Sequence, residues 1–368
     1  MAHQNESLRE NLTSTFHQVI AGKIGALFGA STHLDTVQSL AGDASSRRYY
    51  RAKLSGRSPK SVIVMELPAG SALPLSSEEL TVFNEPLKEL PFLNVHRLLN
   101  RVGVRVPKLY GHWEQDGILV LEDLGDVALW DHVQTLGPAE VLRWYQKAID
   151  ELLVLQIRGT ESRDDACVAF QQRFDFALYM WEFDHFIEYG LKKRPGARIS
   201  RKSLEPLRAA FVEVARRLDR QTPCLNHRDY HSWNLMVHDE AIAVIDFQDA
   251  LLAPPQYDLA SLLNDRETDR LISPELENEL IRYYLRAREQ MGEPKTDPQE
   301  FFEIYLLTAI QRDLKVVGRF YYLDLVKGKP GYKKFIPPTV RRLKRNLART
   351  PPLESIAPIL AEHYEEMR

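Results

Sequence analysis

The feature that most constrains this chain is a short polar segment followed by an apolar strand. Residues 227–234 read His-Arg-Asp-Tyr-His-Ser-Trp-Asn, so Asn234 follows Asp229 by five positions, and the apolar run 242–245 ends in Asp246, twelve residues after Asn234. This order is typical of a phosphoryl-transfer site, in which a carboxylate orients the attacking hydroxyl and oxygen ligands hold a divalent cation against phosphates. It predicts Asp229 as the catalytic base and Asn234 and Asp246 as magnesium ligands, with ATP as the phosphate donor.

Neither half of this pattern is specific by itself. An aspartate in a His-Arg-Asp triplet is often a loop cap or an ion-pair partner, and an aspartate at the end of a strand is often a turn residue. The two halves occur in the required order, and they follow a region that is predicted to be a small sheet. This combination favours the functional interpretation.

The overall composition excludes several classes of protein. With 368 residues, 44% hydrophobic and 27% charged, the chain can bury a core and is long enough for two domains. The formal net charge of -3 gives no general affinity for nucleic acid or an anionic membrane. Two cysteines are too few for a disulfide framework, and neither a signal peptide nor a span of about 20 apolar residues is found. We therefore expect a cytoplasmic protein with no nucleic-acid or membrane partner.

Hydrophobic periodicity predicts an α+β fold whose first domain, residues 1–125, is a small antiparallel sheet. A helix carrying apolar residues at helical spacing from Leu8 to Leu27 opens the chain, and a second helical segment carries Phe92 to Leu99. Short β-favouring runs bounded by turn residues predict five strands. They cover residues 36–40, 49–54, 61–65, 104–109 and 117–121.

The second predicted domain, residues 126–368, is larger and mainly helical. Its first helix starts near Pro138, a residue type suited to a first helical turn. Further helices are expected over residues 168–192, 204–220, 256–265, 275–291 and 298–327, with a strand pair at 235–237 and 243–247. A ligand site is expected in a cleft between the two domains.

Two further segments are candidate nucleotide-binding elements. Residues 42–48, which read Gly-Asp-Ala-Ser-Ser-Arg-Arg, offer backbone N–H groups, hydroxyls and positive charge to a triphosphate. A hairpin turn without function would read the same way. Glu122 and Leu124 follow a strand at the domain boundary, where backbone groups could pair with adenine, although an acidic turn is the plainer alternative. The predicted nucleotide-binding residues are Gly42, Ser45, Ser46, Arg47, Glu122 and Leu124.

These motifs together resemble the aminoglycoside phosphotransferase/choline kinase superfamily, which has a protein-kinase-like fold. Residues 42–51, 245–250, 257–263 (Tyr-Asp-Leu-Ala-Ser-Leu-Leu) and 311–318 (Gln-Arg-Asp-Leu-Lys-Val-Val-Gly) more narrowly resemble the anomeric N-acetylmuramate/N-acetylglucosamine kinases of peptidoglycan recycling. The resemblance implies phosphorylation of the anomeric hydroxyl of an amino sugar. It also implies that His227 and Asp258 support the catalytic loop.

The sequence departs from the kinase pattern at one position. Met65 stands in the strand where many phosphotransferases carry the lysine that binds the α- and β-phosphates. Arg47, Arg48, Arg51 and Lys53 are candidate substitutes. Protein substrates become less plausible, and a catalytically dead binding module is an alternative that the presence of Asp229 and its partners opposes.

Candidate residues for binding the acceptor lie in two segments. An aromatic helix over residues 174–189 carries Glu182 and Asp184, which could bind sugar hydroxyls, although a core-facing helix is the plainer interpretation. Arg312 and Lys315 could approach an acidic acceptor or form surface ion pairs. The basic tail at 333–349 is expected to be a solvated helix face. Another small-alcohol kinase, acting on aminoglycosides or a choline-like acceptor, remains open, as does the oligomeric state.

Overall fold

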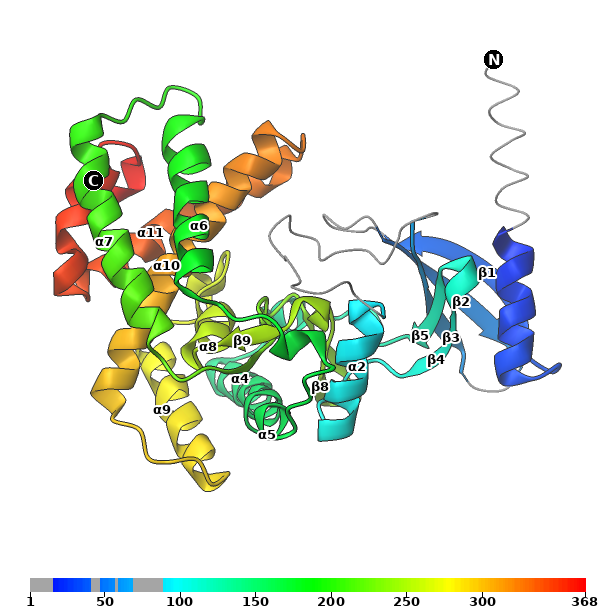
Figure 1. The fold of residues 1–368 in the computed structure, drawn as a ribbon. Helices are drawn as coiled ribbons and strands as arrows, with labels where there is room; N and C mark the ends of the chain where they lie inside the picture. Colours follow the sequence, from blue (N-terminus) through cyan, green and yellow to red (C-terminus); the bar gives the residue numbers. More distant parts are fainter. Residues whose placement is uncertain (1–15, 41–46, 57–58, 69–88) are drawn as a thin grey trace, which may run out of the picture. The chain divides into compact units, whose positions relative to one another are not determined.

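A computed structural model of the chain describes residues 16–40, 47–56, 59–68 and 89–368. The chain forms two compact units, one from residues 1–81 and 106–126 and the other from residues 82–105 and 127–368 (Figure 1). The predicted boundary at residue 125 assigns residues 82–105 to the first domain, whereas here they group with the larger unit.

The smaller unit contains a five-stranded antiparallel sheet with strand order β1-β2-β3-β5-β4. A helix over residues 16–28 lies beside the sheet (Figure 1). Ile20 and Ile24 of this helix pack with Ala52, Val62 and Val64, because four-residue spacing in a helix and two-residue spacing in a strand each place side chains on one face. The strands are β1 (His33–Leu40), β2 (Arg48–Ser55), β3 (Ser61–Glu66), β4 (Leu109–Trp113) and β5 (Ile118–Glu122).

One of the five predicted strands is misplaced. The expected strand at 104–109 is wrong, because residues 104–108 are not in a strand and β4 begins only at Leu109. Pro107 explains the shift, since proline has no N–H to donate to a neighbouring strand. The predicted helix segment before residue 16 lies outside the described residues.

The larger unit is mainly helical, which confirms the predicted fold class of a small antiparallel-sheet unit and a larger helical unit. Two two-stranded sheets, β6 with β9 and β7 with β8, interrupt the helices. The strands are β6 (Cys224–Asn226), β7 (Leu235–His238), β8 (Ala241–Val244) and β9 (Leu251–Ala253). The helices are α2 (Pro91–Val102), α3 (Leu129–Val133), α4 (Pro138–Leu153), α5 (Gly159–Glu161), α6 (Phe176–His185), α7 (Arg201–Asp219), α8 (Gln256–Leu263), α9 (Pro274–Gln290), α10 (Pro298–Leu325), α11 (Ile336–Ala348) and α12 (Ala357–Ala361).

Side-chain caps fix where α10 and α6 begin. Asp297 accepts hydrogen bonds from the N–H groups of Gln299 and Glu300 at 2.8 and 2.9 Å, and Pro298 occupies the first turn of α10. Asp175 accepts from the N–H of Leu178 and starts α6 at residue 176. The predicted single helix over 168–192 is therefore wrong in extent, because residues 171–175 are not helical and residues 186–192 form a π-helical continuation.

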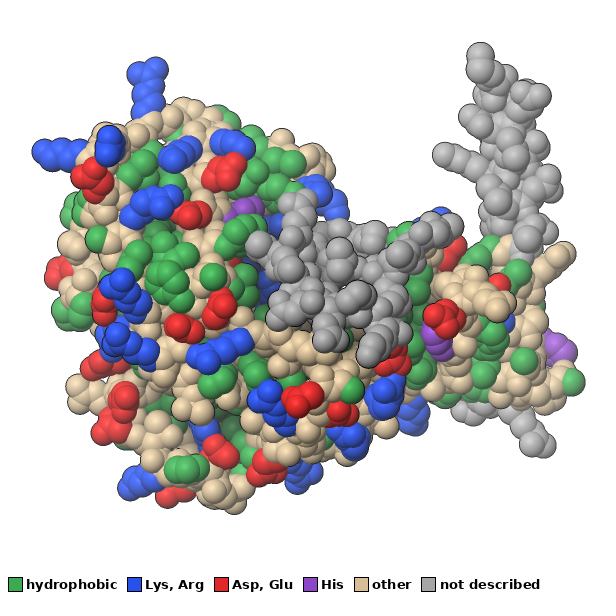
Figure 2. Space-filling view, viewed as in Figure 1, with side chains coloured by type: hydrophobic (Ala, Val, Ile, Leu, Met, Phe, Trp, Pro, Cys, Tyr) green, Lys and Arg blue, Asp and Glu red, His purple; other side chains and the backbone are tan. Residues whose placement is uncertain are grey.

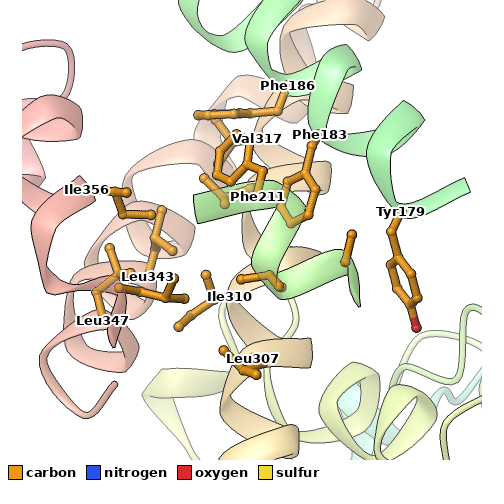
Figure 3. Packing of buried hydrophobic residues seen from close by; sticks show 14 of the residues in the cluster. Tyr179, Phe183, Phe186, Phe211, Leu307, Ile310, Val317, Leu343, Leu347 and Ile356 are labelled. Carbon is orange, nitrogen blue, oxygen red and sulfur yellow. The ribbon is translucent and has the colours of Figure 1, made fainter. Parts of the chain in front are cut away.

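Helix α10 runs through the main hydrophobic core of the larger unit. Figure 3 shows Ile310 and Val317 of α10 in one hydrophobic cluster with Phe183, Phe211 and Leu343. The rings of Phe183 and Phe211 stack 4.2 Å apart between α6 and α7. Because these side chains are at most 1% exposed, α10 is held on several sides by close packing.

The basic tail differs from its predicted role as a wholly solvated helix face. Residues 336–348 form α11 as expected, but Arg342 is buried and its Nη2 lies 2.6 Å from Asp313 Oδ1. Burial of this arginine is possible because the carboxylate and the carbonyl oxygen of Arg266 accept its N–H groups. On the face in Figure 2, basic and acidic side chains are interspersed over the described surface. Among the described helices, none has the length and apolarity needed to cross a membrane.

Candidate active site

Asp258 of α8 holds the backbone of residues 227–234, which include the predicted base Asp229 and are called the catalytic segment below. Its two carboxylate oxygens accept hydrogen bonds from the N–H groups of His227 and Arg228, the latter at 3.0 Å. The side chain of Asp258 is fully buried. Burial raises the pKa of Asp258 to about 6, against the favourable charges of His227 and Arg312, so the group is largely a carboxylate at neutral pH. The resemblance implied that Asp258 supports the catalytic loop, and in the structure it accepts these two hydrogen bonds from the loop backbone.

Arg312 of α10 holds the same segment from its other side. Arg228 has a φ of 82°, a left-handed conformation that is unfavourable for a residue with a side chain. The Nη1 atom of Arg312 donates to the carbonyl oxygen of Arg228 at 3.0 Å, and its Nη2 donates to Ser261 Oγ at 2.7 Å. Both polar groups of the strained peptide position are therefore bound, the N–H by Asp258 and the C=O by Arg312.

His227 links this segment to the strand that precedes Asp246. Its Nε2 lies 2.8 Å from the carbonyl oxygen of Ile245, and its Nδ1 lies 3.3 Å from the backbone nitrogen of Asp229. The imidazole is completely buried. His227 therefore spans the two parts of the predicted motif, which are separated by nearly twenty residues in the sequence.

Asp229 keeps access to solvent while positive groups surround it. Its side chain is 40% exposed, whereas the side chain of Lys315, whose Nζ lies 4.0 Å from Asp229 Oδ1, is 9% exposed. Burial would raise the pKa of Asp229, but the positive charges of Lys315, Arg312 and Arg228 outweigh it and hold the pKa below its ordinary value. The carboxylate is therefore ionised at neutral pH and can accept a hydrogen bond from a hydroxyl group.

Asn234 and Asp246 are brought together through the backbone. The carbonyl oxygen of Asn234 accepts from the N–H of Ile245 at 3.0 Å, which sets Asp246 one residue beyond this contact. The Nδ2 atom of Asn234 donates to the carbonyl oxygen of Asp229 at 3.0 Å, so the amide oxygen is the atom suited to bind a cation. Asp246 is exposed, has a φ of 63°, and accepts from Gln248 at 2.9 Å.

This donor set fits magnesium better than zinc. An amide oxygen and a carboxylate are hard ligands, and magnesium commonly takes one or two protein carboxylates and completes its shell with water and phosphate oxygens. Within the described part of the chain, no group of three or more His, Cys, Asp or Glu residues is arranged to hold a metal ion. Asn234 and Asp246 could therefore hold a cation together with a phosphate-bearing ligand.

Several residues of segment 311–318 of α10 contact different parts of the larger unit. Gln311 Nε2 donates to Glu182 Oε2 at 2.6 Å, and Asp313 pairs with Arg342. A Cβ added to Gly318 would lie 2.7 Å from the Cα of Phe186, so a side chain at this position would collide with the backbone of the neighbouring helix. This segment, one of those that carry the narrower resemblance, thus joins α10 to several buried neighbours.

The structure separates the three predicted acceptor-binding residues. Glu182 is 1% exposed and lies 3.4 Å from Lys315 Nζ, which in turn faces Asp229. Asp184 instead forms a surface ion pair with Arg208, and the two side chains are 48% and 49% exposed. Arg312 is 2% exposed and donates to the carbonyl oxygen of Arg228, so the alternative interpretation as a surface ion pair is wrong.

Three of the predicted nucleotide-binding residues, Arg47, Glu122 and Leu124, are described and lie in the smaller unit. Gly42, Ser45 and Ser46 lie outside the described residues, and Arg47 is 6% exposed. Glu122 Oε2 accepts from the N–H of Lys108 at 3.1 Å, and the side chain of Leu124 is buried.

Two of the candidate substitutes for the missing lysine, Arg48 and Arg51, already have acidic partners. Met65 of β3 is completely buried. Arg51 contacts two carboxylates, with its Nε 2.7 Å from Asp123 and its Nη1 2.7 Å from Asp126. Arg48 pairs with Glu66 at 2.9 Å. The charge of Arg51 is thus balanced within the smaller unit, which makes it a poor substitute for the lysine.

The sequence patterns missed three residues that complete the site. Ser261 accepts from Arg312, Gln311 holds Glu182, and the ring of Tyr257 lies 4.6 Å from the guanidinium of Arg312. The available signal was the presence of polar and charged residues inside otherwise apolar helical stretches, because buried charges require partners.

Comparison with known proteins identifies the family of the chain. A model described as the phosphotransferase enzyme family matches residues 36–294. The N-acetylmuramate/N-acetylglucosamine kinase of Pseudomonas aeruginosa is 30% identical to the chain, and the match covers 87% of this chain and 86% of that protein. The kinase of the same name from Neisseria meningitidis is 31% identical, and the match covers 86% of this chain and 88% of that protein. The solved choline kinase LicA of Streptococcus pneumoniae, which has also been solved in complex with AMP, has a similar fold. It has a TM-score of 0.58 and 18% identity, with 91% of this chain and 99% of that chain covered. The chain therefore belongs to the phosphotransferase enzyme family, as its motifs indicated.

Proposed function

We propose that this protein transfers the γ-phosphoryl group of ATP to the anomeric hydroxyl of N-acetylmuramate, N-acetylglucosamine or both. The observation that carries the phosphotransferase part is the catalytic segment, in which bonds from Asp258 and Arg312 fix the backbone beside the exposed carboxylate of Asp229. The names of relatives similar over most of the chain support the choice of amino sugar. The sugar 1-phosphate would serve peptidoglycan recycling, and use of ATP favours a cytoplasmic location.

Asp229 would act on the attacking hydroxyl group. The anomeric oxygen forms a bond to the γ-phosphorus, the bond from this phosphorus to the oxygen bridging to ADP breaks, and the hydroxyl proton passes to the Asp229 carboxylate. A carboxylate whose pKa is lowered is a weak base. Such a base suits a loose transition state, in which the attacking oxygen carries little positive charge until late, so orienting the hydroxyl is the main contribution of Asp229.

Asn234 and Asp246 would hold magnesium against the phosphates. When bound, the cation supplies neutralisation of negative charge on the phosphate oxygens. Asn234 contributes an amide oxygen whose side chain is oriented by its bond to the backbone of Asp229, and Asp246 contributes a carboxylate. The proposed metal ligand Asn234 and the proposed base Asp229 therefore lie in the same segment and are joined by a hydrogen bond.

The test is ATP consumption with N-acetylmuramate, N-acetylglucosamine, kanamycin and choline, each with and without magnesium, followed by phosphorus NMR of the product. We expect magnesium-dependent turnover of an amino sugar and a phosphate signal coupled to the anomeric proton. Turnover restricted to kanamycin or choline would reject the amino-sugar assignment and keep the phosphotransferase. ATP binding without turnover of any acceptor would favour a catalytically dead binding module.

A further inference from the structure

We propose that Lys315 is a positioning residue for phosphoryl transfer, which Glu182 holds against Asp229 from the interior of the larger unit. The inference rests on the proposed function only in that Asp229 acts on the acceptor hydroxyl. It therefore applies to whichever acceptor alcohol the protein phosphorylates.

The first support is the order of the contacts from the interior to the surface. Gln311 donates to Glu182 Oε2 at 2.6 Å, Lys315 Nζ lies 3.4 Å from Glu182 Oε1, and the same Nζ lies 4.0 Å from Asp229 Oδ1. Exposure rises along this series, from 1% for the Glu182 side chain to 9% for Lys315 and 40% for Asp229. Lys315 is thus placed between a buried anchor and the reactive carboxylate.

The second support is that stability alone gives little reason for this pair. Taking a lysine and a glutamate out of water carries a desolvation penalty that their mutual attraction often fails to offset, and apolar residues of the same size can serve as well or better. Glu182 and Lys315 lie beside the apolar cluster that includes Tyr179 and Phe183, where an apolar pair would pack readily. A role in placing charge beside Asp229 accounts for a buried ion pair here.

The third support is the rigidity of the elements that carry the two residues. Lys315 lies three residues after Arg312 on α10, and this spacing puts both side chains on one side of the helix. Arg312 bonds to the backbone of Arg228 while Lys315 faces the side chain of Asp229. One helix therefore fixes the backbone of the catalytic segment and the carboxylate orientation together.

The proposed role gives a specific kinetic signature. The Lys315 cation orients the Asp229 carboxylate and balances its charge, so it affects the rate of the chemical step. It has little effect on the affinity for the substrate. Substitution of Lys315 should lower kcat and leave the KM of the acceptor nearly unchanged. If Lys315 instead bound an acidic group of the acceptor, its substitution would raise the KM for N-acetylmuramate and leave the KM for N-acetylglucosamine, which lacks the lactyl carboxylate, unchanged.

The experiment is a double-mutant cycle on the full-length chain with Lys315→Met, Glu182→Gln and the double variant, and with Lys295→Met as an exposed-lysine control. Because Lys315→Met leaves Glu182 buried without its cation and could unfold the chain, the double variant, which removes both charges, carries the test. Thermal unfolding identifies the folded variants. Steady-state kinetics with both amino sugars, or with any other acceptor that the wild type phosphorylates, then supply kcat and KM.

We expect the double variant to lose 10- to 100-fold in kcat, with acceptor KM changed less than about threefold. Glu182→Gln alone should lower kcat less, and it should have no further effect in the Lys315→Met background, because Glu182 acts through Lys315. A folded double variant with wild-type kcat would overturn the proposal, as would a rise in KM confined to N-acetylmuramate. Failure of the wild type to use amino sugars would reject the proposed function and leave this comparison valid for another acceptor.

Discussion

Replacement of Asp258 by asparagine should reduce catalysis far more than it reduces stability. The two side chains have nearly the same shape, but asparagine has a single acceptor oxygen, and Asp258 accepts from the N–H groups of both His227 and Arg228. In Asp258→Asn one of these buried N–H groups faces an amide NH2 group instead. The loss of a hydrogen bond to a charged group weakens the native conformation of the segment by about 1.5–3 kcal/mol.

Stability changes less because the substitution also removes a buried charge. The pKa of Asp258 is raised by burial to about 6, roughly two units above that of an exposed aspartate, which corresponds to about 3 kcal/mol of unfavourable free energy for the ionised form at neutral pH. Relief of this cost offsets the lost hydrogen bond, so the unfolding free energy should change by less than about 2 kcal/mol. A loss of about 1.5–3 kcal/mol from the native conformation of the segment lowers the fraction of molecules in which Asp229 is correctly placed. The value of kcat then falls about 10- to 100-fold.

The pH dependence supplies an independent check with a definite sign. Because the folded-state pKa of Asp258 lies above its unfolded value, the folded state binds this proton more tightly. The contribution of Asp258 to stability is fully present below about pH 4 and is lost as the pH rises through about 6. Activity runs the other way, since the wild-type segment gains its second acceptor as Asp258 ionises. The side chains whose charge acts on Asp258 are those of His227 and Arg312, while Arg228 contributes only its backbone N–H.

The assay combines steady-state kinetics and urea unfolding between pH 5 and 8, with Asp175→Asn as the control, because asparagine caps a helix as well as aspartate does. We expect wild-type kcat to fall below pH 6 and the Asp258→Asn variant to lack this fall. We expect the variant to be least stable relative to wild type at the acidic end. A variant with wild-type kcat and an unchanged acid limb would refute the reasoning.

Three further outcomes are expected. Asp229→Asn should lower kcat about 10²- to 10⁴-fold with little change in thermal unfolding, since a general base is removed from a partly exposed position, and a near-wild-type rate would contradict its role. Arg342→Met should lower the unfolding free energy by about 3–5 kcal/mol, measured by urea unfolding, because it leaves Asp313 buried without its partner; replacing both by apolar residues should recover most of the loss. Gly318→Ala should destabilise the chain by about 1–3 kcal/mol, because the new Cβ meets the backbone of Phe186, whereas the same change at the open Gly292, whose φ is 97°, tests backbone strain without a clash.

Short-range patterns were enough to identify the candidate site because its main residues are close in sequence. The segment 227–234 and the strand before Asp246 are joined by one hairpin, β7 with β8, so their proximity follows from local pairing. The small antiparallel sheet was also predictable, since alternation and turn residues specify strands locally. The start of β4 after Pro107 and the start of α6 after its cap Asp175 differ from the prediction, because hydrophobic periodicity takes no account of proline or of helix caps.

The surroundings of the site could not be predicted, because the partners come from distant parts of the chain. Gln311 contacts a residue 129 positions away, and Arg312 contacts one 84 positions away. Nothing in the local sequence distinguishes Glu182, which is buried beside Lys315, from Asp184, which forms a surface ion pair two residues later. Only tertiary packing decides which of two neighbouring carboxylates faces the interior.

The geometry of the catalytic segment depends on the last third of the chain. Successive residues of an α-helix are about 100° apart, so Arg312 and Lys315 lie on one side of α10 while Asp313 lies well around the helix from Lys315. The first two contact the catalytic segment, and Asp313 pairs with Arg342 of α11. Rotation or sliding of α10 would therefore break buried ion pairs on two sides at once, and each break would leave a charge without its partner. Helix α10, itself paired to α11, thus fixes the position of the catalytic segment, in which Arg228 lies 84 positions before Arg312.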